Sequence, residues 1–509
     1  MSSKEIKGGA FLSYAQMGLS VLIGIVYTPI MLKLLGQSEY GLYSTVVSTI
    51  SMLSMLSLGF GSSYIRYFSK YRANGDQISI NRLNGLLMSI FGVIGVIVLI
   101  CGIFISNHLE LLFDTGLSAS EYHTAKSLVL LMTINLAVTL GVSLFTSIIQ
   151  AYERFIFLKI VGILSSVANP VISLPLLIFG AGAMGMGIAA LSVTLISNLV
   201  IIGYCFKRLH VAFDFRKWQK GLLKSLFAYT SFIALNAIVD QINWNIDKVL
   251  LGRVQGTAAV ATYSIGYALY SYYMQISLAV SSVFTPRIHS IENSSDSEIT
   301  KNFNYTQLMV RVGRIQFLIL GLVLCGLIFF GKQFIYYWAG TGYENAYYVC
   351  LLLSIPATVP LVQNVGIEIQ RAKNKHQFRS VIYAGMAILN LAISIFFCQL
   401  WGEIGCAAGT AVSLIVANGF VMNAYYKHLG ININEFWKQI VCAGRGVLLP
   451  ILFGVVLNRF FPAESIFMLG GYIAAFTGVY VISIWFTSLN TYEKNLIKGL
   501  HKKVARKHA

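Results

Sequence analysis

A row of amide and carboxylate side chains lies within one otherwise apolar stretch of the sequence. Asn236, Asp240, Asn243 and Asp247 are spaced four, three and four residues apart. On an α-helix, this spacing stacks the four side chains along one narrow face. If the stretch crosses a membrane, each carboxylate costs about 2.5–3.5 kcal/mol to insert, so an ionisable residue there is a functional hypothesis by default.

Two interpretations fit this row. In the functional one, Asp240 and Asp247 bind a coupling H⁺ or Na⁺, while Lys248, Arg253 and the two asparagines of the row contact an anionic substrate. In the structural one, an Asp–Lys network holds the two halves of the chain together. Both interpretations keep this helix face away from lipid.

The composition predicts a membrane protein. Hydrophobic residues make up 56% of the 509 residues and charged residues 11%, with a mean hydropathy of +0.71. These values leave too few polar groups to cover a soluble globule of this size. A spanning helix needs about 20 mainly apolar residues. Fourteen such runs are centred on residues 11–34, 40–64, 85–106, 125–149, 156–179, 182–206, 223–251, 258–286, 309–331, 346–369, 381–400, 404–426, 440–457 and 466–486.

The sequence also matches itself at a constant offset of 220 residues, which indicates an internal duplication. The matching pairs are Gly36 and Gly256, Tyr43 and Tyr263, Ser44 and Ser264, Gln150 and Gln370, Gly182 and Gly402, Gly185 and Gly405, Asn198 and Asn418, and Lys207 and Lys427, with Lys159 matching Arg379 in charge. At the same offset, Ser20 and Tyr27 stand where the two aspartates of the polar row stand. The acidic residues therefore occur in one copy only.

The predicted spans divide as six, six and two. We expect an N-lobe of six spans in residues 1–210, a C-lobe of six spans in 211–430, two extra spans in 431–490 and a basic cytoplasmic tail in 491–509. Because each copy has an even number of spans, both copies lie the same way up, related by an axis along the membrane normal. Transporters of this design hold substrate between the two halves, near the bilayer midplane.

Further cations stand at the ends of predicted spans. Lys33 matches Arg253 at the outer ends of the lead spans of the two lobes. Arg66 stands at the inner end of the second span, and Arg311 and Arg314 stand at the inner end of the ninth. Each is a candidate for binding a phosphate of the substrate. The alternative is a side chain that snorkels to the membrane interface.

The net charge of +18 does not indicate nucleic-acid binding. If the N-terminus is cytoplasmic, most Lys and Arg residues fall in loops on the inner side, as the positive-inside rule requires. The same residues can contact anionic membrane lipids. We therefore expect both termini to be cytoplasmic and no nucleic-acid partner.

The sequence offers no chemistry for an enzyme. It contains no Gly-rich phosphate loop, no His-Glu-x-x-His and no Gly-x-Ser-x-Gly motif. The seven cysteines have no paired spacing, and the eight histidines lie in predicted loops or at span ends. We expect no catalytic residue, no metal site and no cofactor. A membrane enzyme of glycan assembly is the alternative of another class, but the sequence lacks the large outer loop that would hold its acceptor.

Several segments resemble one family. They are Leu35-Gly-Gln-Ser-Glu-Tyr-Gly-Leu-Tyr-Ser44, Leu58-Gly-Phe-Gly61 with Arg66, Asp247-Lys-Val-Leu-Leu-Gly252, Pro286-Arg-Ile288, and the Gly-x-x-Gly starts of the sixth and twelfth spans. Their order and spacing are similar to those of the polysaccharide-export flippases in the multidrug/oligosaccharidyl-lipid/polysaccharide exporter superfamily. The resemblance covers essentially the whole chain.

The resemblance implies a V-shaped pair of six-helix lobes that works by alternating access. It implies that an undecaprenyl-diphosphate-linked oligosaccharide repeat unit crosses a bacterial cytoplasmic membrane for surface polysaccharide, such as the O-antigen of lipopolysaccharide or a capsule. Glycan polymerase or assembly proteins are implied partners. Drug and cation antiporters of the superfamily usually have twelve spans and the flippases fourteen, so the two extra spans favour a lipid-linked cargo. The acidic Asp240 keeps a multidrug or cation antiporter as the alternative.

Overall fold

The structure is a computed structural model that describes residues 3–113, 117–216, 220–373, 375 and 377–495. Within these residues the chain is helical and contains no strand. Residues 496–509, most of the predicted basic tail, lie outside the described residues. The helices before residue 220 are α1 (Ser3–Leu35), α2 (Gln37–Met52), α3 (Phe60–Ala73), α4 (Gln77–Asn107), α5 (Ala119–Ala151), α6 (Phe155–Ile178) and α7 (Gly182–Leu209).

The second copy of the repeat follows the same order. Its helices are α8 (Lys220–Val254), α9 (Thr257–Ser282), α10 (Thr285–Glu292), α11 (Glu298–Ala339), α12 (Asn345–Val362), α13 (Asn364–Ala372), α14 (Gln377–Leu414) and α15 (Met422–His428). The C-terminal helices are α16 (Ile433–Gly444), α17 (Leu448–Phe460) and α18 (Ile466–Thr487). Short 3₁₀ or π segments interrupt the order at η1 (Leu53–Ser57), η2 (Leu109–Leu111), η3 (Ile415–Val421) and η4 (Arg445–Val447).

Eleven helical segments in the described residues are long and apolar enough to cross a membrane. The prediction of an all-α, multi-pass membrane protein is therefore confirmed. One of the eleven, Gln377–His428, contains two predicted spans, which meet at the non-helical Gly402. The predicted seventh and eighth spans form the helices α8 and α9, which are not among the eleven. The count of fourteen spans stays a prediction.

The duplication is visible in the backbone. Gly36 (φ 80°) and Gly256 (φ 83°) each separate a lead helix from the next one, and Gly182 (φ 52°) and Gly402 (φ 55°) each begin the last long helical segment of a copy. These left-handed conformations strain residues that carry a Cβ. Glycine at the same offset in both copies therefore marks backbone breaks that both copies need.

Polar side chains set the starts of several helices. The Asp76 carboxylate accepts the Ser79 N–H at the start of α4, and Ser118 forms a reciprocal capping pair with Glu121 at the start of α5. Such caps satisfy the otherwise unpaired N–H groups of the first helical turn. Hydrogen bonds from the Ser79 side chain and backbone hold the pKa of Asp76 below its ordinary value.

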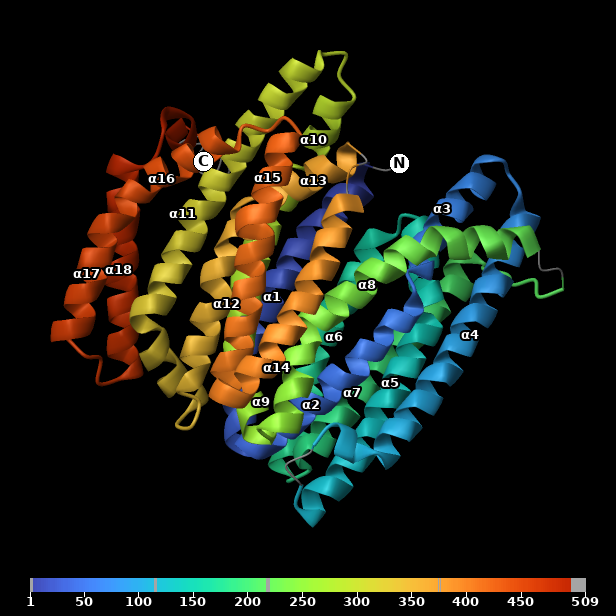
Figure 1. The fold of residues 1–509 in the computed structure, drawn as a ribbon. Coiled ribbons are helices and arrows are strands. Elements are labelled where there is room, and N and C mark those ends of the chain that lie inside the picture. Colours follow the sequence, from blue (N-terminus) through green and yellow to red (C-terminus); the bar gives the residue numbers. More distant parts are fainter. Residues whose placement is uncertain (1–2, 114–116, 217–219, 374, 376, 496–509) are drawn as a thin grey trace, which may run out of the picture. The chain divides into compact units, whose positions relative to one another are not determined.

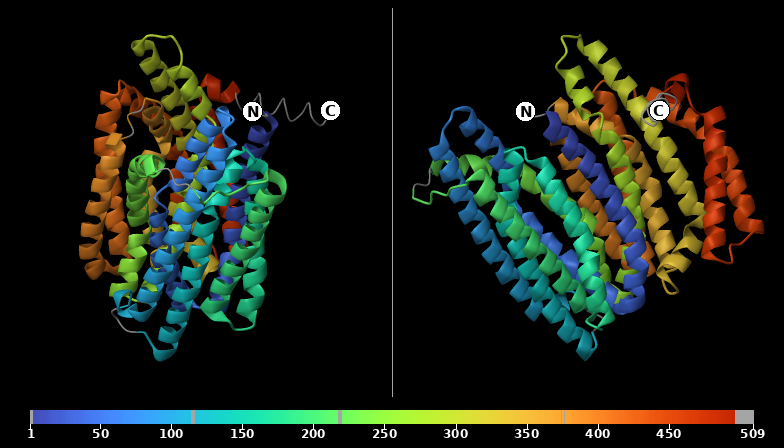
Figure 2. Two further views of the ribbon diagram at one scale, coloured as in Figure 1. Left: turned by 90° about the vertical axis from the view of Figure 1, so that its right-hand side faces the viewer. Right: turned by 180° about the vertical axis from the view of Figure 1, so that it is seen from behind.

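The chain forms two compact units. Unit 1 comprises Met1–Ser264 and Leu391–Cys406, and unit 2 comprises Ile265–Asn390 and Ala407–Ala509. In unit 1, α5 packs between α4 and α7, and α1 packs along α6 (Figure 1). In unit 2, α11 packs against α12, α16 and α18 (Figure 2). The predicted lobe boundaries near residues 210 and 430 describe the sequence repeat and stay predictions.

The core of unit 1 includes a buried polar chain among aromatic rings. The Tyr64 hydroxyl donates to Asn84 Oδ1 at 2.9 Å, and Asn84 Nδ2 donates to the Ala212 carbonyl oxygen at 2.9 Å. Tyr64 also stacks on Phe68, with ring centroids 5.6 Å apart. The tyrosine is buried without leaving its hydroxyl unpaired, so these bonds fix the position of α3 on α4.

The first turns of α2 and α9 bind each other within unit 1. Ser38 and Thr257 share a hydrogen bond between their hydroxyl oxygens at 2.9 Å, and Gln37 Nε2 donates to Thr262 Oγ1 at 3.1 Å. A Cβ atom at Gly41 would overlap the Thr257 carbonyl oxygen. Gln37 and Thr257 are equivalent positions of the repeat. The close approach of the two copies at this point therefore requires glycine at position 41.

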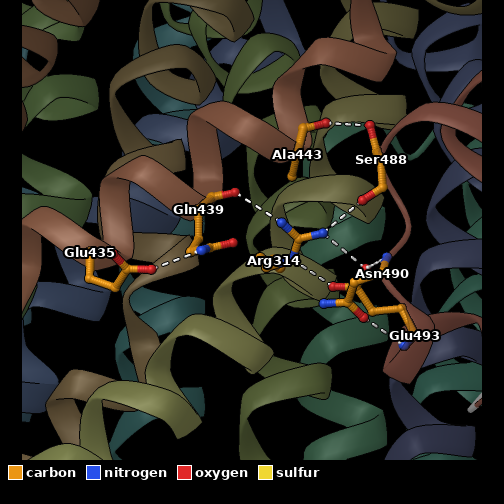
Figure 3. Close-up of polar contacts among 7 residues, drawn as sticks. All are labelled: Arg314, Glu435, Gln439, Ala443, Ser488, Asn490 and Glu493. Atoms are coloured by element: carbon orange, nitrogen blue, oxygen red, sulfur yellow. Dashed lines mark hydrogen bonds and ion pairs between the residues drawn. The ribbon is translucent and has the colours of Figure 1, made fainter.

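A buried ion pair joins α11 to the segment that follows α18 (Figure 3). Arg314 Nε donates to Glu493 Oε1 at 2.7 Å, and one terminal nitrogen donates to Glu493 Oε2 at 3.0 Å. The guanidinium also donates to the Ser488 carbonyl oxygen at 2.7 Å and to that of Gln439 at 3.1 Å. Arg314 is 3% exposed and Glu493 4%. Four of the five donors of the guanidinium are used, so the network anchors the C-terminal helices to α11.

We predict that Gly41→Ala lowers the thermal unfolding midpoint of the protein in detergent. Alanine favours a helix over glycine by about 1 kcal/mol, but overpacking against Thr257 costs about 1–3 kcal/mol. Gly18→Ala is the matched control, because nothing lies within 4 Å of a Cβ at that helical position. Size-exclusion melting curves of both variants give the comparison. A midpoint for Gly41→Ala at or above that of Gly18→Ala would contradict the close approach.

We predict a larger loss of stability for Glu493→Ala. Removing one partner of a buried ion pair costs about 3–5 kcal/mol, because the remaining charge is left uncompensated. Glu298→Ala is the control, since Glu298 is exposed and its ion pair with Lys373 at 3.4 Å contributes about 0–1 kcal/mol. Equal midpoints for the two variants in the same melting assay would mean that Arg314 does not anchor the C-terminal helices.

Candidate functional site

The predicted polar row lies on α8, but its four members differ in burial. Asp240 is exposed and Asn236 is half-buried, whereas Asn243 and Asp247 are 6% and 3% exposed. All four residues lie in the continuous helix α8, so they have the helical spacing that the row requires. The unusual members are Asn243 and Asp247, next to the turn into α9, because their polar side chains are buried.

Asp247 is held by a tyrosine of the next helix. The Tyr263 hydroxyl donates to Asp247 Oδ2 at 2.7 Å, and Tyr263 is 2% exposed. A hydrogen bond to a carboxylate of this length is charge-assisted. Gly256, in the turn between α8 and α9, lets the chain reverse so that the two side chains meet. The tyrosine therefore fixes the orientation of the buried carboxyl group.

Sequence reasoning missed Tyr263 as a site residue, although the tyrosine anchors the repeat. Its counterpart is Tyr43, and the counterpart of Asp247 is Tyr27. Tyr27 shares a hydrogen bond with Ser173 at 2.8 Å between hydroxyl oxygens. A hydroxyl thus stands in the first copy where the second copy has a carboxylate. The aligned tyrosines were the signal that could have pointed to a partner for Asp247.

Asn243 is the member of the row with no visible partner. Among the residues that the structure describes, neither its Oδ1 nor its Nδ2 atom has a hydrogen-bond partner, although the side chain is buried. An unpaired buried amide costs about 1–3 kcal/mol, and such groups in folded proteins generally have a partner, water included. One helical turn from Asp247, this amide can contribute an oxygen ligand or a donor to a small bound species.

A second polar row on α8 contacts the first copy of the repeat. Gln241 Nε2 donates to Ser54 Oγ at 3.1 Å, and Asn245 Nδ2 donates to Gln241 Oε1 at 2.7 Å. Ser54 lies in η1, directly after α2. Gly252 also approaches α2 closely, because a Cβ atom at that position would lie 2.7 Å from Thr45 Cγ2. These contacts fix α8 against α2, while Asp247 contacts the first part of α9 through Tyr263.

The predicted cationic residues are placed differently from one another. Lys248 is half-buried beside Asp247, and Arg253 is exposed in the last turn of α8. Lys33 is exposed in the last turn of α1, where a cation suits the negative end of the helix dipole. Arg66 is exposed on α3. Their contacts with a substrate stay predictions.

Arg311 and Arg314 belong to unit 2 and lie beside a cavity of about 290 Å³, with Glu435, Gln439 and Tyr492 in its lining. Arg311 is exposed, with its guanidinium carbon 5.1 Å from the Tyr492 ring centroid. Arg314 binds Glu493 and two carbonyl oxygens. A phosphate could contact Arg314 only by competing with these acceptors, whereas Arg311 remains accessible.

The site on α8 brings oxygen-bearing side chains together, and its binding of a coupling H⁺ or Na⁺ stays a prediction. It combines a buried carboxylate, a buried amide and a phenol within two turns of helix and one neighbouring helix. Oxygen ligands of this kind suit hard monovalent cations or a proton. In the part of the chain that the structure describes, no group of three or more His, Cys, Asp and Glu side chains is placed to hold a metal ion.

Comparison with solved structures establishes the fold. The chain is similar to the lipid II flippase MurJ in an inward closed conformation, with a TM-score of 0.75 and 14% identity over 96% of this chain and 99% of that one. It is also similar to an inward-facing multidrug resistance MATE family transporter of the MOP superfamily, with a TM-score of 0.59 and 13% identity over 80% of this chain and 98% of that one. At these identities the likeness concerns the fold alone.

Two curated relatives have related sequences. One is described as an uncharacterized membrane protein in the cps region of Klebsiella pneumoniae, 23% identical over 57% of this chain and 59% of the relative. The other is described as the uncharacterized membrane protein EpsK of Bacillus subtilis strain 168, 23% identical over 83% of each chain. The chain thus spans 59% of the length of the Klebsiella relative and 83% of that of the Bacillus relative.

The family profile described as polysaccharide biosynthesis protein matches residues 6–292, more than half of the 509 residues. Together with the MurJ-like and MATE-like fold, this match confirms the resemblance seen in the sequence. The chain belongs to the polysaccharide biosynthesis protein family of multi-pass membrane proteins.

Proposed function

We propose that the protein flips undecaprenyl-diphosphate-linked oligosaccharide repeat units from the inner to the outer leaflet of a bacterial cytoplasmic membrane. The units would serve the assembly of a surface polysaccharide such as an O-antigen or a capsule. Both termini would be cytoplasmic. The protein would break no bond and would act by alternating access, with glycan polymerase or assembly proteins as partners.

The extent of the match to MurJ carries the proposal. That flippase covers 96% of this chain, whereas the MATE transporters cover 80–84%. The MATE matches leave about a sixth of the chain or more unmatched, a share similar to that of residues 431–509. A fold that includes the C-terminal helices favours a lipid-linked cargo over a small soluble drug.

A lipid-linked oligosaccharide needs a transporter because its sugars and phosphates cannot cross hydrocarbon unaided. Sugars and phosphates lose their hydration in hydrocarbon, and each unpaired polar group there costs several kcal/mol. Polar side chains of the protein can replace that water while the polyprenyl tail stays among the lipids. In this proposal Asp240 and Asp247 bind the coupling H⁺ or Na⁺, and Tyr263 orients Asp247 by its 2.7 Å hydrogen bond.

A cation-coupled multidrug antiporter is the second candidate. The acidic residues of α8 and the similarity to multidrug resistance MATE transporters favour it. A membrane enzyme of glycan assembly, the candidate of another class, would elongate or transfer glycan when purified. No observation in the described residues favours the enzyme.

We expect deletion of the gene to leave lipid-linked repeat units accumulating on the inner leaflet. Lipid extraction followed by mass analysis identifies what accumulates, and complementation with the wild-type gene should remove it. A deletion strain with normal surface glycan and new drug sensitivity would instead establish the antiporter and contradict the flippase.

We expect Asp240→Asn to reduce transport while leaving the amount of protein in the membrane unchanged, because the amide keeps the size of the side chain but cannot take up a proton. Ser20→Ala is the matched control at the equivalent position of the first copy. Flipping is measured in proteoliposomes across a range of pH and Na⁺ concentration. Wild-type rates in the variant under all these conditions would remove Asp240 from the coupling mechanism.

A further inference from the structure

Unit 2 contains a cavity of about 340 Å³ that the predicted site residues do not reach. It lies where the end of α9, the start of α10, α13 and the start of α14 meet. Its lining consists of Leu278, Ser281, Ser282, Thr285, Asn364, Ile367, Glu368, Arg371 and Arg379. The volume lies at the lower end of the range for ligand pockets, about 300–1,000 Å³.

The charged groups of this lining leave one cation without a carboxylate. Arg371 Nη1 donates to Glu368 Oε1 at 2.7 Å, so these two residues neutralise each other. Arg379 has no such partner among the lining residues: its Nε atom is buried and has no hydrogen-bond acceptor in the part of the chain that the structure describes. Its guanidinium carbon lies 4.4 Å from the Tyr383 ring centroid. The cavity wall therefore carries a net positive charge and an unused donor.

The guanidinium of Arg379 is positioned before any ligand arrives. Contact with the face of the Tyr383 ring restricts the plane of the guanidinium. An arginine held in this way loses less conformational freedom when its planar fork binds an anion. A buried donor without an acceptor costs about 1–3 kcal/mol, and an anion in the cavity would remove that cost.

Hydroxyl and amide groups complete the lining. Ser281 Oγ donates to the Ser277 and Leu278 carbonyl oxygens, both at 3.3 Å. These bonds are long for a hydroxyl donor, so the group can turn to a better acceptor. Asn364 Nδ2 donates to Ser277 Oγ at 2.9 Å, and Gln316 Nε2 donates to the Ser277 carbonyl oxygen at 3.1 Å. This buried network fixes the wall of the cavity next to Ser281.

The repeat shows that the fold does not require these polar groups. At the offset of 220 residues, Asn364 and Glu368 correspond to Leu144 and Ile148, which are fully buried core residues of unit 1. Thr285 and Arg371 correspond to Ile65 and Ala151. Only Arg379 keeps a cationic counterpart, Lys159. These four positions carry apolar side chains in the first copy, so the fold itself does not require polar groups at them.

We propose that this cavity binds the phosphate group of a lipid headgroup. The fork of Arg379 contacts two phosphate oxygens, and the hydroxyls of Ser281 and Thr285 donate to the same group. Charge-assisted bidentate contacts of this kind are the strong ones in proteins. The phosphate belongs either to the diphosphate of a lipid-linked cargo, a source that rests on the proposed function, or to a phospholipid of the surrounding membrane.

The test measures binding to the purified full-length protein. The probes are farnesyl diphosphate, inorganic diphosphate, and nanodiscs that contain phosphatidylglycerol or only phosphatidylcholine. We expect Arg379→Gln to weaken farnesyl diphosphate binding by about tenfold or more, a factor that corresponds to about 1.4 kcal/mol. Arg379→Lys should retain part of the affinity, since an ammonium supplies the charge without the fork. Lys159→Gln, the matched control, should bind like the wild type.

The probes separate the two sources of phosphate. Farnesyl diphosphate binding that phosphatidylglycerol nanodiscs do not reduce assigns the site to a lipid diphosphate. Binding that phosphatidylglycerol, but not phosphatidylcholine, reduces assigns it to anionic membrane lipid. Thr285→Val replaces a hydroxyl by a methyl group of similar size, and we expect it to weaken binding several-fold. This second variant tests the proposal even if Arg379→Gln does not fold.

The proposal is overturned if the wild type binds no probe, or if Arg379→Gln and Thr285→Val bind farnesyl diphosphate as the wild type does. That outcome would leave the proposed function untouched, because the function is tested by the lipids of a deletion strain. Conversely, a deletion strain without accumulated repeat units would contradict the function, while a loss of binding in Arg379→Gln would still establish the phosphate site.

Discussion

Hydrocarbon supplies no partner for a backbone N–H or carbonyl group, and the architecture of this protein follows from that constraint. Each described segment that can cross a membrane is a helix, in which the backbone pairs with itself. Breaks between helices occur where glycine permits a left-handed conformation, as at Gly36 and Gly256, or where a side chain such as Asp76 caps the new helix. The same constraint makes every polar side chain within a helix a feature that needs a partner.

The duplication lets structural and functional polar groups be told apart. Positions that both copies share, such as the glycines at 182 and 402, serve the backbone. Several positions that differ carry polar groups of the candidate sites, although Tyr263 and Arg379 keep a tyrosine and a cation as counterparts in the first copy. Asp247 replaces a tyrosine that merely bonds a serine, and the polar lining around Arg379 replaces buried aliphatic residues of the first copy. A scaffold that is stable with hydroxyl or apolar groups does not need carboxylates or arginines at these places.

Arg314 and Arg379 illustrate how two similar arginines acquire different roles. Arg314 donates to a carboxylate and two carbonyl oxygens, so its charge is compensated and removing its partner would destabilise the protein. Arg379 packs on the Tyr383 ring, and its Nε atom has no hydrogen-bond acceptor among the described residues. A satisfied buried cation is a structural anchor, whereas a cation with a buried, unused donor beside a cavity is suited to bind a ligand. Asn243 is comparable in the α8 site, because its amide is buried and has no hydrogen-bond partner among the described residues.

Composition and residue spacing were sufficient to predict the membrane location, the helices, the repeat and the polar row on α8. These features depend on neighbouring residues and on one constant offset. The partners of the polar groups were not predictable in this way. Tyr263 reaches Asp247 across a turn, Glu493 reaches Arg314 across 179 residues, and the lining around Arg379 comes from four helices. Whether a charged side chain is an anchor or a binding group depends on which acceptors surround it. That depends on helix packing, which brings together residues that no local pattern connects.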